Sequence, residues 1–132
     1  MEKLQGQNID RLPLCGVLSV SIASKKSLSE TFDTFKKLNK KANNWKGRTN
    51  HKERLKVLKH YKVKCKDFRL GKITLKNFTD QHTVKGKMYM ITTTGHIQIV
   101  QDGMITDQRG TKPISEYWGK DKRLNHIQLE II

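Results

Sequence analysis

The spacing of hydrophobic residues changes near residue 62, about halfway along the chain. Before this point apolar side chains recur three or four positions apart, most clearly in residues 28–41, as on one face of a helix. After it the period becomes two in residues 87–92 and 96–100, which is typical of β-strands. Helices followed by an antiparallel sheet predict an α+β fold.

The first half of the chain contains signals for three helices. Residues 15–24 are small and apolar and predict a short buried helix, although their β-branched members leave a strand open. A Ser-x-x-Glu motif at Ser27 and an Asn-x-x-Glu motif at Asn50 are helix-capping patterns. They predict helices over residues 28–41 and 51–61.

The second half contains signals for strands and tight turns. The pair Asp102-Gly103 is a strong signal for a two-residue hairpin loop, which joins the strand at 96–100 to a return strand at 104–107. Apolar residues alternate again in residues 124–132, and this alternation predicts a closing strand.

Length and composition limit the class of protein. The 132 residues suffice for one domain, which we expect to have a helical half over residues 1–61 and mainly antiparallel sheet over residues 62–132. No apolar run approaches the ~18 residues of a membrane span, and the N-terminus is too polar for a secretory signal. We therefore expect no membrane contact. Two cysteines are too few for a disulfide framework and fit a reducing, cytoplasmic compartment.

Positive charge dominates the composition. The chain has 27 Lys and Arg residues against 12 Asp and Glu residues, which gives a net charge of +15. Residues 36–75 alone hold 15 basic and two acidic side chains. Because such a field attracts polyanions, we expect the segment to bind nucleic acid or an acidic protein.

Five residues of this segment are candidates for contact with a polyanion. Lys52, Lys56 and Lys59 share one face of a predicted helix, at spacings of four and three. Trp45 and Arg48 lie in the preceding loop, and a ring next to a guanidinium is a pairing that stacks on bases and binds phosphate. No helix-turn-helix, zinc-finger or RNP motif predicts sequence-specific recognition.

Cys15 lies where a reactive thiol is expected. It begins the first predicted helix, and a helix N-terminus favours the thiolate form of cysteine. Gly16 follows it and leaves space around the sulfur. The other cysteine, Cys65, is surrounded by lysines, and we expect a structural thiol or an edge thiol there.

The predicted hairpin places an imidazole next to a carboxylate. A two-residue loop pairs positions whose numbers sum to 205, so Gln98 faces Asp107 across the two strands. His96 is then the diagonal neighbour of Asp107 on the same face, within reach for a carboxylate that orients an imidazole. Ile97 and Ile99 point to the other face and into the core.

These residues together resemble the papain-like fold group of cysteine peptidases. The similarity lies in a Cys that opens a helix of small residues and in a later G-H-x-x-x-V-x-D-G-x-x-x-D segment, from Gly95 to Asp107. The chain resembles in particular the small, single-domain bacteriocin-peptidase-like proteins of phages and bacteria. The resemblance implies a papain-like fold, in which a helical half carries the Cys and an antiparallel sheet carries the His and then the Asp.

The resemblance also implies an activity and the residues that perform it. It implies a cysteine hydrolase of the peptidase, isopeptidase or amidase type that acts through a thioester, although the same residues also serve acyl transfer. Cys15 is then the nucleophile, His96 the general base and acid, and Asp107 the orienting residue. The side chain that binds the oxyanion is expected a few residues before the Cys, at Gln7 or Asn8, with Gln7 preferred.

Several partners follow from these interpretations, and one alternative stays open. We expect a peptide or protein substrate, acidic if the basic helices recruit it, and no cofactor. The Cys and His spacings give no zinc motif, so we expect no metal. Tyr117 and Trp118 either shield the imidazole from water or pack in the core.

The alternative to a cysteine hydrolase is an inactive papain-like scaffold. Such a chain would be a basic phage or bacterial accessory protein that binds nucleic acid or an acidic host protein, in the host cytoplasm if it is viral.

Overall fold

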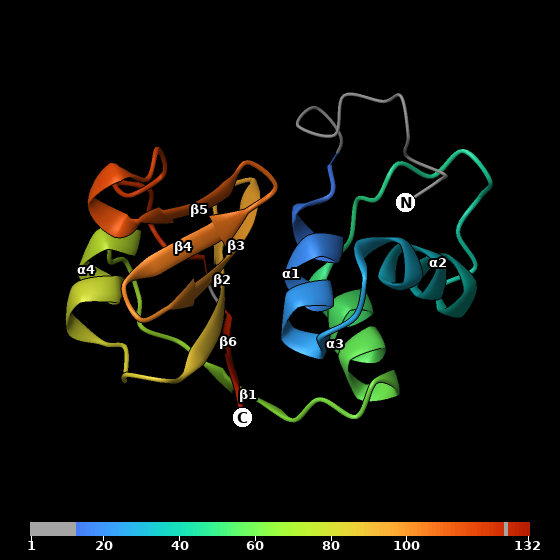
Figure 1. Ribbon diagram of the computed structural model, residues 1–132, viewed down its shortest axis with the longest axis horizontal. Coiled ribbons are helices and arrows are strands. Elements are labelled where there is room, and N and C mark those ends of the chain that lie inside the picture. The colour runs from blue at the N-terminus through green and yellow to red at the C-terminus, as the bar shows by residue number, and fades with distance from the viewer. Residues whose placement is uncertain (1–12, 126) are drawn as a thin grey trace. The chain divides into compact units, whose positions relative to one another are not determined.

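A computed structural model describes residues 13–125 and 127–132 of the chain (Figure 1). The chain divides into two compact units, one that ends at Lys64 and one that begins at Cys65. The first unit is helical and the second is built around a sheet. The predicted α+β class, with helices first, is therefore confirmed, and the change from helices to sheet falls three residues later than expected.

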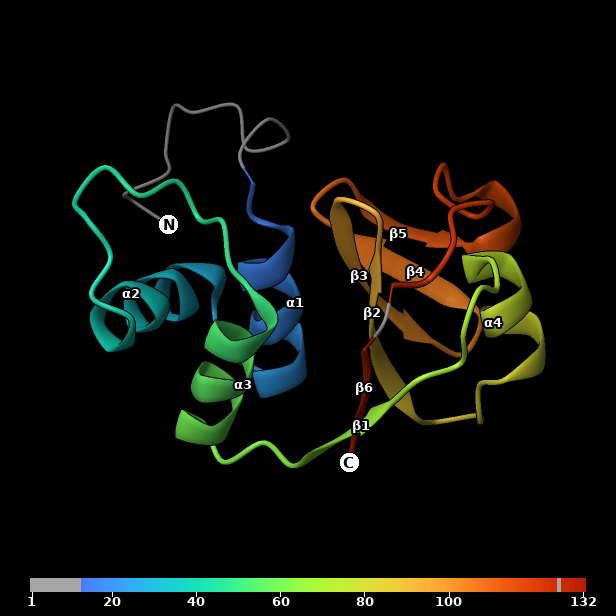
Figure 2. The same cartoon turned by 180° about the vertical axis from the view of Figure 1, so that it is seen from behind.

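In its described part the first unit consists of three helices, each packed against the other two (Figure 2). They are α1 (Cys15–Ser24), α2 (Leu28–Leu38) and α3 (His51–His60). The helix expected over residues 15–24 is confirmed, and its β-branched residues do not make it a strand.

Side chains at the expected positions cap α2 and α3. Ser27 Oγ accepts a hydrogen bond from the backbone N–H of Glu30 at 3.0 Å. At α3 the capping box is complete: Asn50 Oδ1 accepts from the N–H of Glu53 at 2.8 Å, and Glu53 Oε1 accepts from the N–H of Asn50 at 3.0 Å. These bonds satisfy backbone donors that have no partner within the helix.

A lysine with positive φ follows each of the three helices. The φ angles are 56° at Lys25, 50° at Lys40 and 61° at Lys62. Glycine is the usual residue in this left-handed conformation, but a cation at the C-terminal end of a helix interacts favourably with the helix dipole. Because Lys40 is left-handed, α2 ends at Leu38, and the predicted helix to residue 41 was too long.

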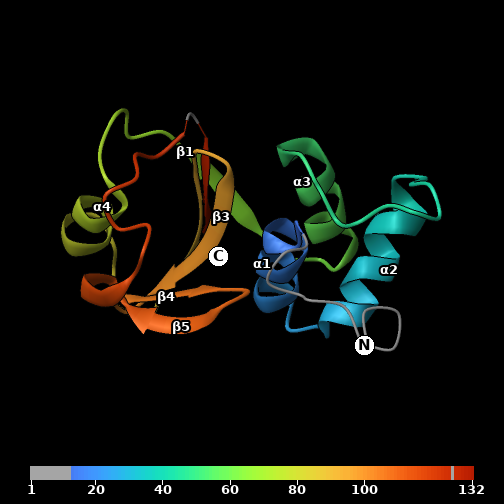
Figure 3. The same cartoon turned by 90° about the horizontal axis from the view of Figure 1, so that it is seen from above.

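Within the described residues the second unit has a sheet of six antiparallel strands in the order β1-β6-β2-β3-β4-β5, all labelled in Figure 1. Figure 3 shows β3, β4 and β5 of this sheet from above. The strands are β1 (Cys65–Phe68), β2 (Met88–Thr93), β3 (His96–Gln101), β4 (Met104–Asp107), β5 (Gly110–Pro113) and β6 (Gln128–Ile131). Strands β2 to β5 follow one another as in a meander, whereas β6 inserts between β1 and β2. The expected closing strand over 124–132 is thus confirmed in a shorter form, and β5 was not predicted.

One face of the sheet carries a hydrophobic core together with α4 (Leu75–Gln81) and the short 3-10 helix η3 (Ile114–Glu116). Val100 of β3 and Ile105 of β4 are cross-strand partners within this core. Ile97 is buried on the opposite face, as expected, but the core cluster lies on the face of Val100 and not on that of Ile97. Both faces of β3 therefore hold buried side chains.

No helix in the part of the chain that the structure describes is both long enough and apolar enough to cross a membrane.

Candidate active site

The hairpin between β3 and β4 has the predicted register. Gln101 pairs with Met104, as a two-residue loop requires. Asp102 and Gly103 have φ angles of 52° and 77°, and two positive values are the signature of a type I′ turn. The turn therefore sets which side chains of β3 and β4 share a face.

This register brings His96 into contact with Asp107. The Nε2 atom of His96 lies 3.1 Å from Oδ2 of Asp107. An ionised carboxylate only accepts hydrogen bonds, so Nε2 carries the proton and Nδ1 holds the lone pair of the neutral ring. The contact between the two side chains that the hairpin register predicts is confirmed, and the catalytic role of the pair stays a prediction.

Three more donors surround the carboxylate of Asp107. Its Oδ2 accepts from the hydroxyl of Tyr117 at 2.8 Å and from the indole N–H of Trp118 at 3.1 Å. Its Oδ1 accepts from the backbone N–H of Arg109 at 2.8 Å. Burial raises the pKa of Asp107, but the hydrogen bonds from His96, Arg109, Tyr117 and Trp118 outweigh it and hold the pKa well below its usual range. Asp107 is therefore a permanent anion at neutral pH.

A buried glutamine extends this network into the core. Gln98 is 1% exposed, and its Nε2 donates to the carbonyl of Ile91 at 2.6 Å. Its Oε1 lies 3.2 Å from the hydroxyl of Tyr117. The hairpin register predicts that Gln98 lies opposite Asp107, but no pattern in the sequence identifies Tyr117 as a partner of Gln98, because Tyr117 reaches the site only through β5 and η3.

Trp118 covers the imidazole of His96. The two ring centroids are 5.2 Å apart, and 47% of Trp118 is exposed to solvent. Arg109 and Lys122 place cations over the indole, at 5.0 Å and 4.6 Å from its centroid. The expectation that Trp118 shields the imidazole fits these contacts, and the hydrogen bond from Trp118 to Asp107 adds a positioning role.

A surface cavity of about 230 Å³ adjoins Asp107. Its lining includes Asp107, Trp118, Arg109, Lys112 and Glu116. Two cations and one exposed carboxylate line its rim, so the cavity has mixed charge.

In the helical unit, Cys15 is the first residue of α1, as predicted. Its side chain is partly buried, and the N-cap residue before it, Leu14, is fully buried. The thiol therefore lies at the positive end of the helix dipole, an environment that favours thiolate. The Leu14 side chain makes no capping bond to the α1 backbone.

A buried arginine near Cys15 was not foreseen. Arg54 of α3 is 5% exposed, and its Nη1 donates to the carbonyl and the Oγ1 of Thr49, both at 3.0 Å. Burial lowers the pKa of Arg54, whereas the charges of Cys15 and Glu53 act in the opposite direction. In the sequence Arg54 is one of many basic residues, and only tertiary packing separates it from the exposed ones.

Cys65 lies on β1, at an edge of the sheet, as expected. Burial and then the charge of Asp67 raise the pKa of the Cys65 thiol. A raised pKa leaves a smaller fraction of the Cys65 thiol as thiolate at neutral pH.

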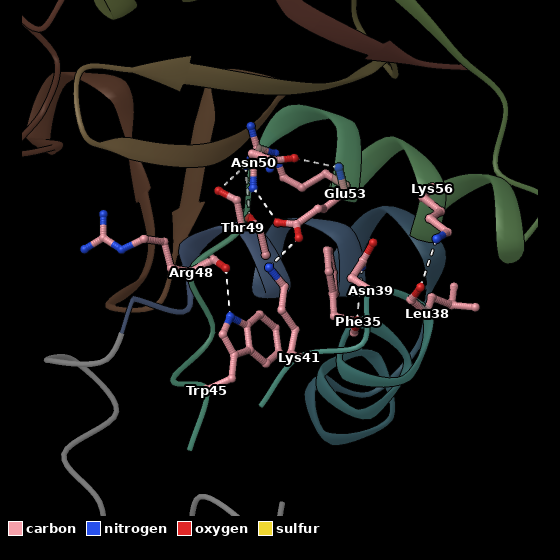
Figure 4. A network of polar contacts seen from close by, with 11 residues as sticks. Phe35, Leu38, Asn39, Lys41, Trp45, Arg48, Thr49, Asn50, Glu53 and Lys56 are labelled. Carbon is pink, nitrogen blue, oxygen red and sulfur yellow. Dashed lines mark hydrogen bonds and ion pairs between the residues drawn. The ribbon is translucent and has the colours of Figure 1, made fainter. Parts of the chain in front are cut away.

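The candidate polyanion-binding residues all lie in the helical unit, and Figure 4 shows part of this region. Lys52, Lys56 and Lys59 are exposed on α3. Trp45 is partly buried, and its indole N–H donates to the backbone carbonyl of the exposed Arg48 at 2.9 Å.

The remaining candidates have different outcomes. Gln7 and Asn8 lie outside the described residues. No group of three or more His, Cys, Asp or Glu side chains in residues 13–125 and 127–132 is arranged to hold a metal ion.

Comparisons with protein-family models, curated proteins and solved structures find no match to this chain.

Proposed function

We propose that the chain is a cysteine hydrolase with a papain-like fold, in which Cys15 is the nucleophile, His96 the general base and acid, and Asp107 the orienting residue. The hydrogen bond between His96 Nε2 and Asp107 Oδ2 carries the proposal. It leaves Nδ1 as the basic nitrogen, and a base held in one tautomer by a buried carboxylate is what a thiol nucleophile requires.

The reaction class that these groups fit is acyl transfer from an amide to water. Nδ1 of His96 takes the proton of Cys15, and the thiolate attacks the carbonyl carbon to give a tetrahedral oxyanion. When the C–N bond breaks, the imidazolium returns the proton to the leaving amine and a thioester remains. Water, deprotonated by the same nitrogen, attacks the thioester, and the carboxylic acid and the thiol are released. The substrate is a peptide, isopeptide or related amide.

The oxyanion needs hydrogen-bond donors in both halves of this reaction. In the proposal the backbone N–H of Cys15, at the N-terminus of α1, is the first donor. Gln7 supplies the second, with Asn8 as the alternative.

Two features of the helical unit support a thiolate at Cys15. Its position at the N-terminus of α1 favours negative charge, and the charge of Arg54 adds to this preference. A chain that works through a reduced thiol belongs in a reducing compartment, and we propose the cytoplasm for this reason.

Alkylation with iodoacetamide at pH 6 tests the proposal. Mass spectrometry of the two tryptic peptides measures the rates at Cys15 and Cys65 in the same sample. We expect Cys15 to react at least tenfold faster than Cys65, since about one pKa unit corresponds to a tenfold change in thiolate. His96→Gln should remove most of the difference at pH 6, because the imidazolium no longer stabilises the thiolate.

Hydrolysis of a fluorogenic peptide library gives the second readout. Activity that disappears in Cys15→Ala and in His96→Gln, but persists in Cys65→Ser, supports the mechanism. Equal alkylation of the two cysteines, together with activity that survives Cys15→Ala, would show that Cys15 is not the nucleophile. The inactive papain-like scaffold would then be the better description.

A further inference from the structure

The surface of the helical unit is almost free of negative charge between residues 36 and 64. Nine basic side chains of this segment are exposed: Lys37, Lys40, Lys46, Arg48, Lys52, Lys56, Lys59, Lys62 and Lys64. Its one acidic residue, Glu53, is already engaged, because Oε1 closes the capping box of α3 and Oε2 pairs with Lys41. A monomeric surface normally mixes both signs, so this segment is built to attract anions.

A contact between α2 and α3 joins part of this charge into one surface. Lys56 Nζ donates to the carbonyl of Leu38, the last residue of α2, at 2.9 Å (Figure 4). Lys52 and Lys59 lie on the same side of α3 as Lys56. We define the basic face as Lys40, Lys52, Lys56 and Lys59.

The basic face lacks the features of a protein interface. Every exposed large hydrophobic residue of the described chain lies in the sheet unit: Leu70, Val84, Met104, Trp118 and Ile132. Interfaces between proteins have buried aromatic or aliphatic anchors at their centre and are depleted in lysine. A surface of lysines without an apolar anchor fits a chain of phosphates better than an acidic protein.

Trp45 is not available as a platform for unpaired bases. The Trp45 ring packs against the ring of Phe32, with centroids 4.9 Å apart. The ammonium of Lys41 lies over the Trp45 ring, 5.6 Å from its centroid. Its N–H is also bonded, to the carbonyl of Arg48. Single-stranded nucleic acid depends on exposed aromatic rings for stacking, so these contacts favour a duplex.

We propose that the basic face binds the phosphate backbone of double-stranded nucleic acid without reading its sequence. Lys52 and Lys59 are seven residues apart, which is about 10 Å along a helix axis. Phosphates of one strand follow each other at about 3.4 Å along the duplex axis, so three lysines in this span match about three phosphates. The proposal does not depend on the proposed hydrolase activity.

Fluorescence anisotropy of the full chain with a labelled 20-base-pair DNA duplex tests this proposal. The association constant is measured between 50 and 300 mM NaCl, and we expect log K to fall linearly with log [NaCl] with a slope of about −3. The variant Lys52→Gln/Lys59→Gln should make the slope about two units less steep and weaken binding at 100 mM salt by at least tenfold. Circular dichroism checks that the variant is folded.

A matched control removes the same charge from the sheet unit. Lys72 and Lys85 are exposed, and Lys72→Gln/Lys85→Gln should leave the slope almost unchanged. Equal weakening by both double variants would overturn the proposal, because net charge and not the basic face would then drive binding. Tighter binding of single strands than of the duplex, or equal competition by polyglutamate, would overturn it as well. Cys15→Ala should bind as the parent does, which separates this result from the test of the hydrolase.

Discussion

The hydroxyl of Tyr117 lies closer to the carboxylate of Asp107 than the imidazole of His96 does, at 2.8 Å against 3.1 Å. Trp118 donates to the same oxygen at 3.1 Å. Asp107 is therefore held by donors that do not titrate near neutral pH. The bonds from Tyr117 and Trp118 do not involve His96, so they hold the carboxylate in place when the imidazole becomes an imidazolium.

This arrangement predicts unequal effects for two conservative substitutions. Tyr117→Phe removes a buried hydroxyl that lies between Asp107 and Gln98. Because the buried oxygens of these two side chains then lack this donor, the substitution should lower the free energy of unfolding by about 1–3 kcal/mol. Trp118→Phe removes a donor from a half-exposed ring, and water can replace it, so about 1 kcal/mol or less is expected. Urea unfolding at pH 7 measures both. A larger loss for Trp118→Phe would contradict the assigned ranking of the two donors.

Asp107→Asn tests the charge of the carboxylate through pH. The folded chain holds the pKa of Asp107 well below that of an unfolded aspartate, so ionisation stabilises the folded state above the unfolded value of about 3.9. This contribution is lost as the pH falls further. At pH 7 we expect the variant to be less stable by about 2 kcal/mol, since four hydrogen bonds to an anion are weakened.

The difference between the parent and Asp107→Asn should begin to shrink near pH 4 and continue to shrink below pH 3, because the unfolded chain takes up the proton first and the folded parent does so only at lower pH. Urea unfolding in steps of half a pH unit follows this change. A difference that stays constant over the range would show that Asp107 does not titrate below its usual pKa in the folded chain. Hydrolysis of the fluorogenic peptides by the same variant measures how far a neutral amide can orient His96.

The contact between His96 and Asp107 was predictable because it is local. Asp102-Gly103 is one of the few dipeptides with low-cost positive φ at both positions, so the turn type and the register follow from two residues. The bonds from Tyr117 and Trp118 to Asp107 were not predictable in the same way. They depend on β5 and η3, which return the chain to the site through pairings that show no hydrophobic alternation in the sequence.

The fold shows the same division between local and distant interactions. The capping residues Ser27 and Asn50 correctly locate the starts of α2 and α3, since each bond spans three residues. The end of α2 was misplaced because Lys40 adopts a conformation in which glycine is usual. The insertion of β6 between β1 and β2 joins segments more than 35 residues apart, and alternation alone does not specify such a partner.

Arg54 offers a test of the electrostatics at Cys15. Arg54→Met keeps an apolar stem and removes the charge, whereas Arg54→Lys keeps the charge but loses the planar fork that binds Thr49. We expect alkylation of Cys15 at pH 6 to slow by about threefold to tenfold in Arg54→Met, because a nearby cation favours thiolate. Arg54→Lys should retain most of the parent rate.

The rate at Cys65 is the internal reference in each sample, because Cys65 lies in the other unit. Equal slowing of Cys15 in the Met and Lys variants would show that packing around Arg54, and not its charge, sets the reactivity of Cys15.

A glycine distant in sequence packs closely against the two residues that precede α1. Gly47 has a φ of +117°, and a Cβ built on it would lie 2.6 Å from Cδ2 of Leu14 and 3.3 Å from the carbonyl oxygen of Pro13. Leu14 is fully buried and precedes Cys15 directly, so it cannot yield without moving the start of the helix. Gly47→Ala should cost about 3 kcal/mol, from backbone strain and from overpacking.

Gly71→Ala is the matched control for this substitution. Gly71 also has a positive φ, +75°, but no atom lies within 4 Å of its Cβ position, so only backbone strain of about 1–2 kcal/mol is expected. Urea unfolding compares the two variants, and alkylation at pH 6 reports on Cys15. Gly47→Ala should also change the alkylation rate, since the thiol and the first N–H groups of α1 move together, whereas Gly71→Ala should not. If Gly47→Ala costs no more than Gly71→Ala and leaves Cys15 equally reactive, then the contact between Gly47 and Leu14 does not position the thiol.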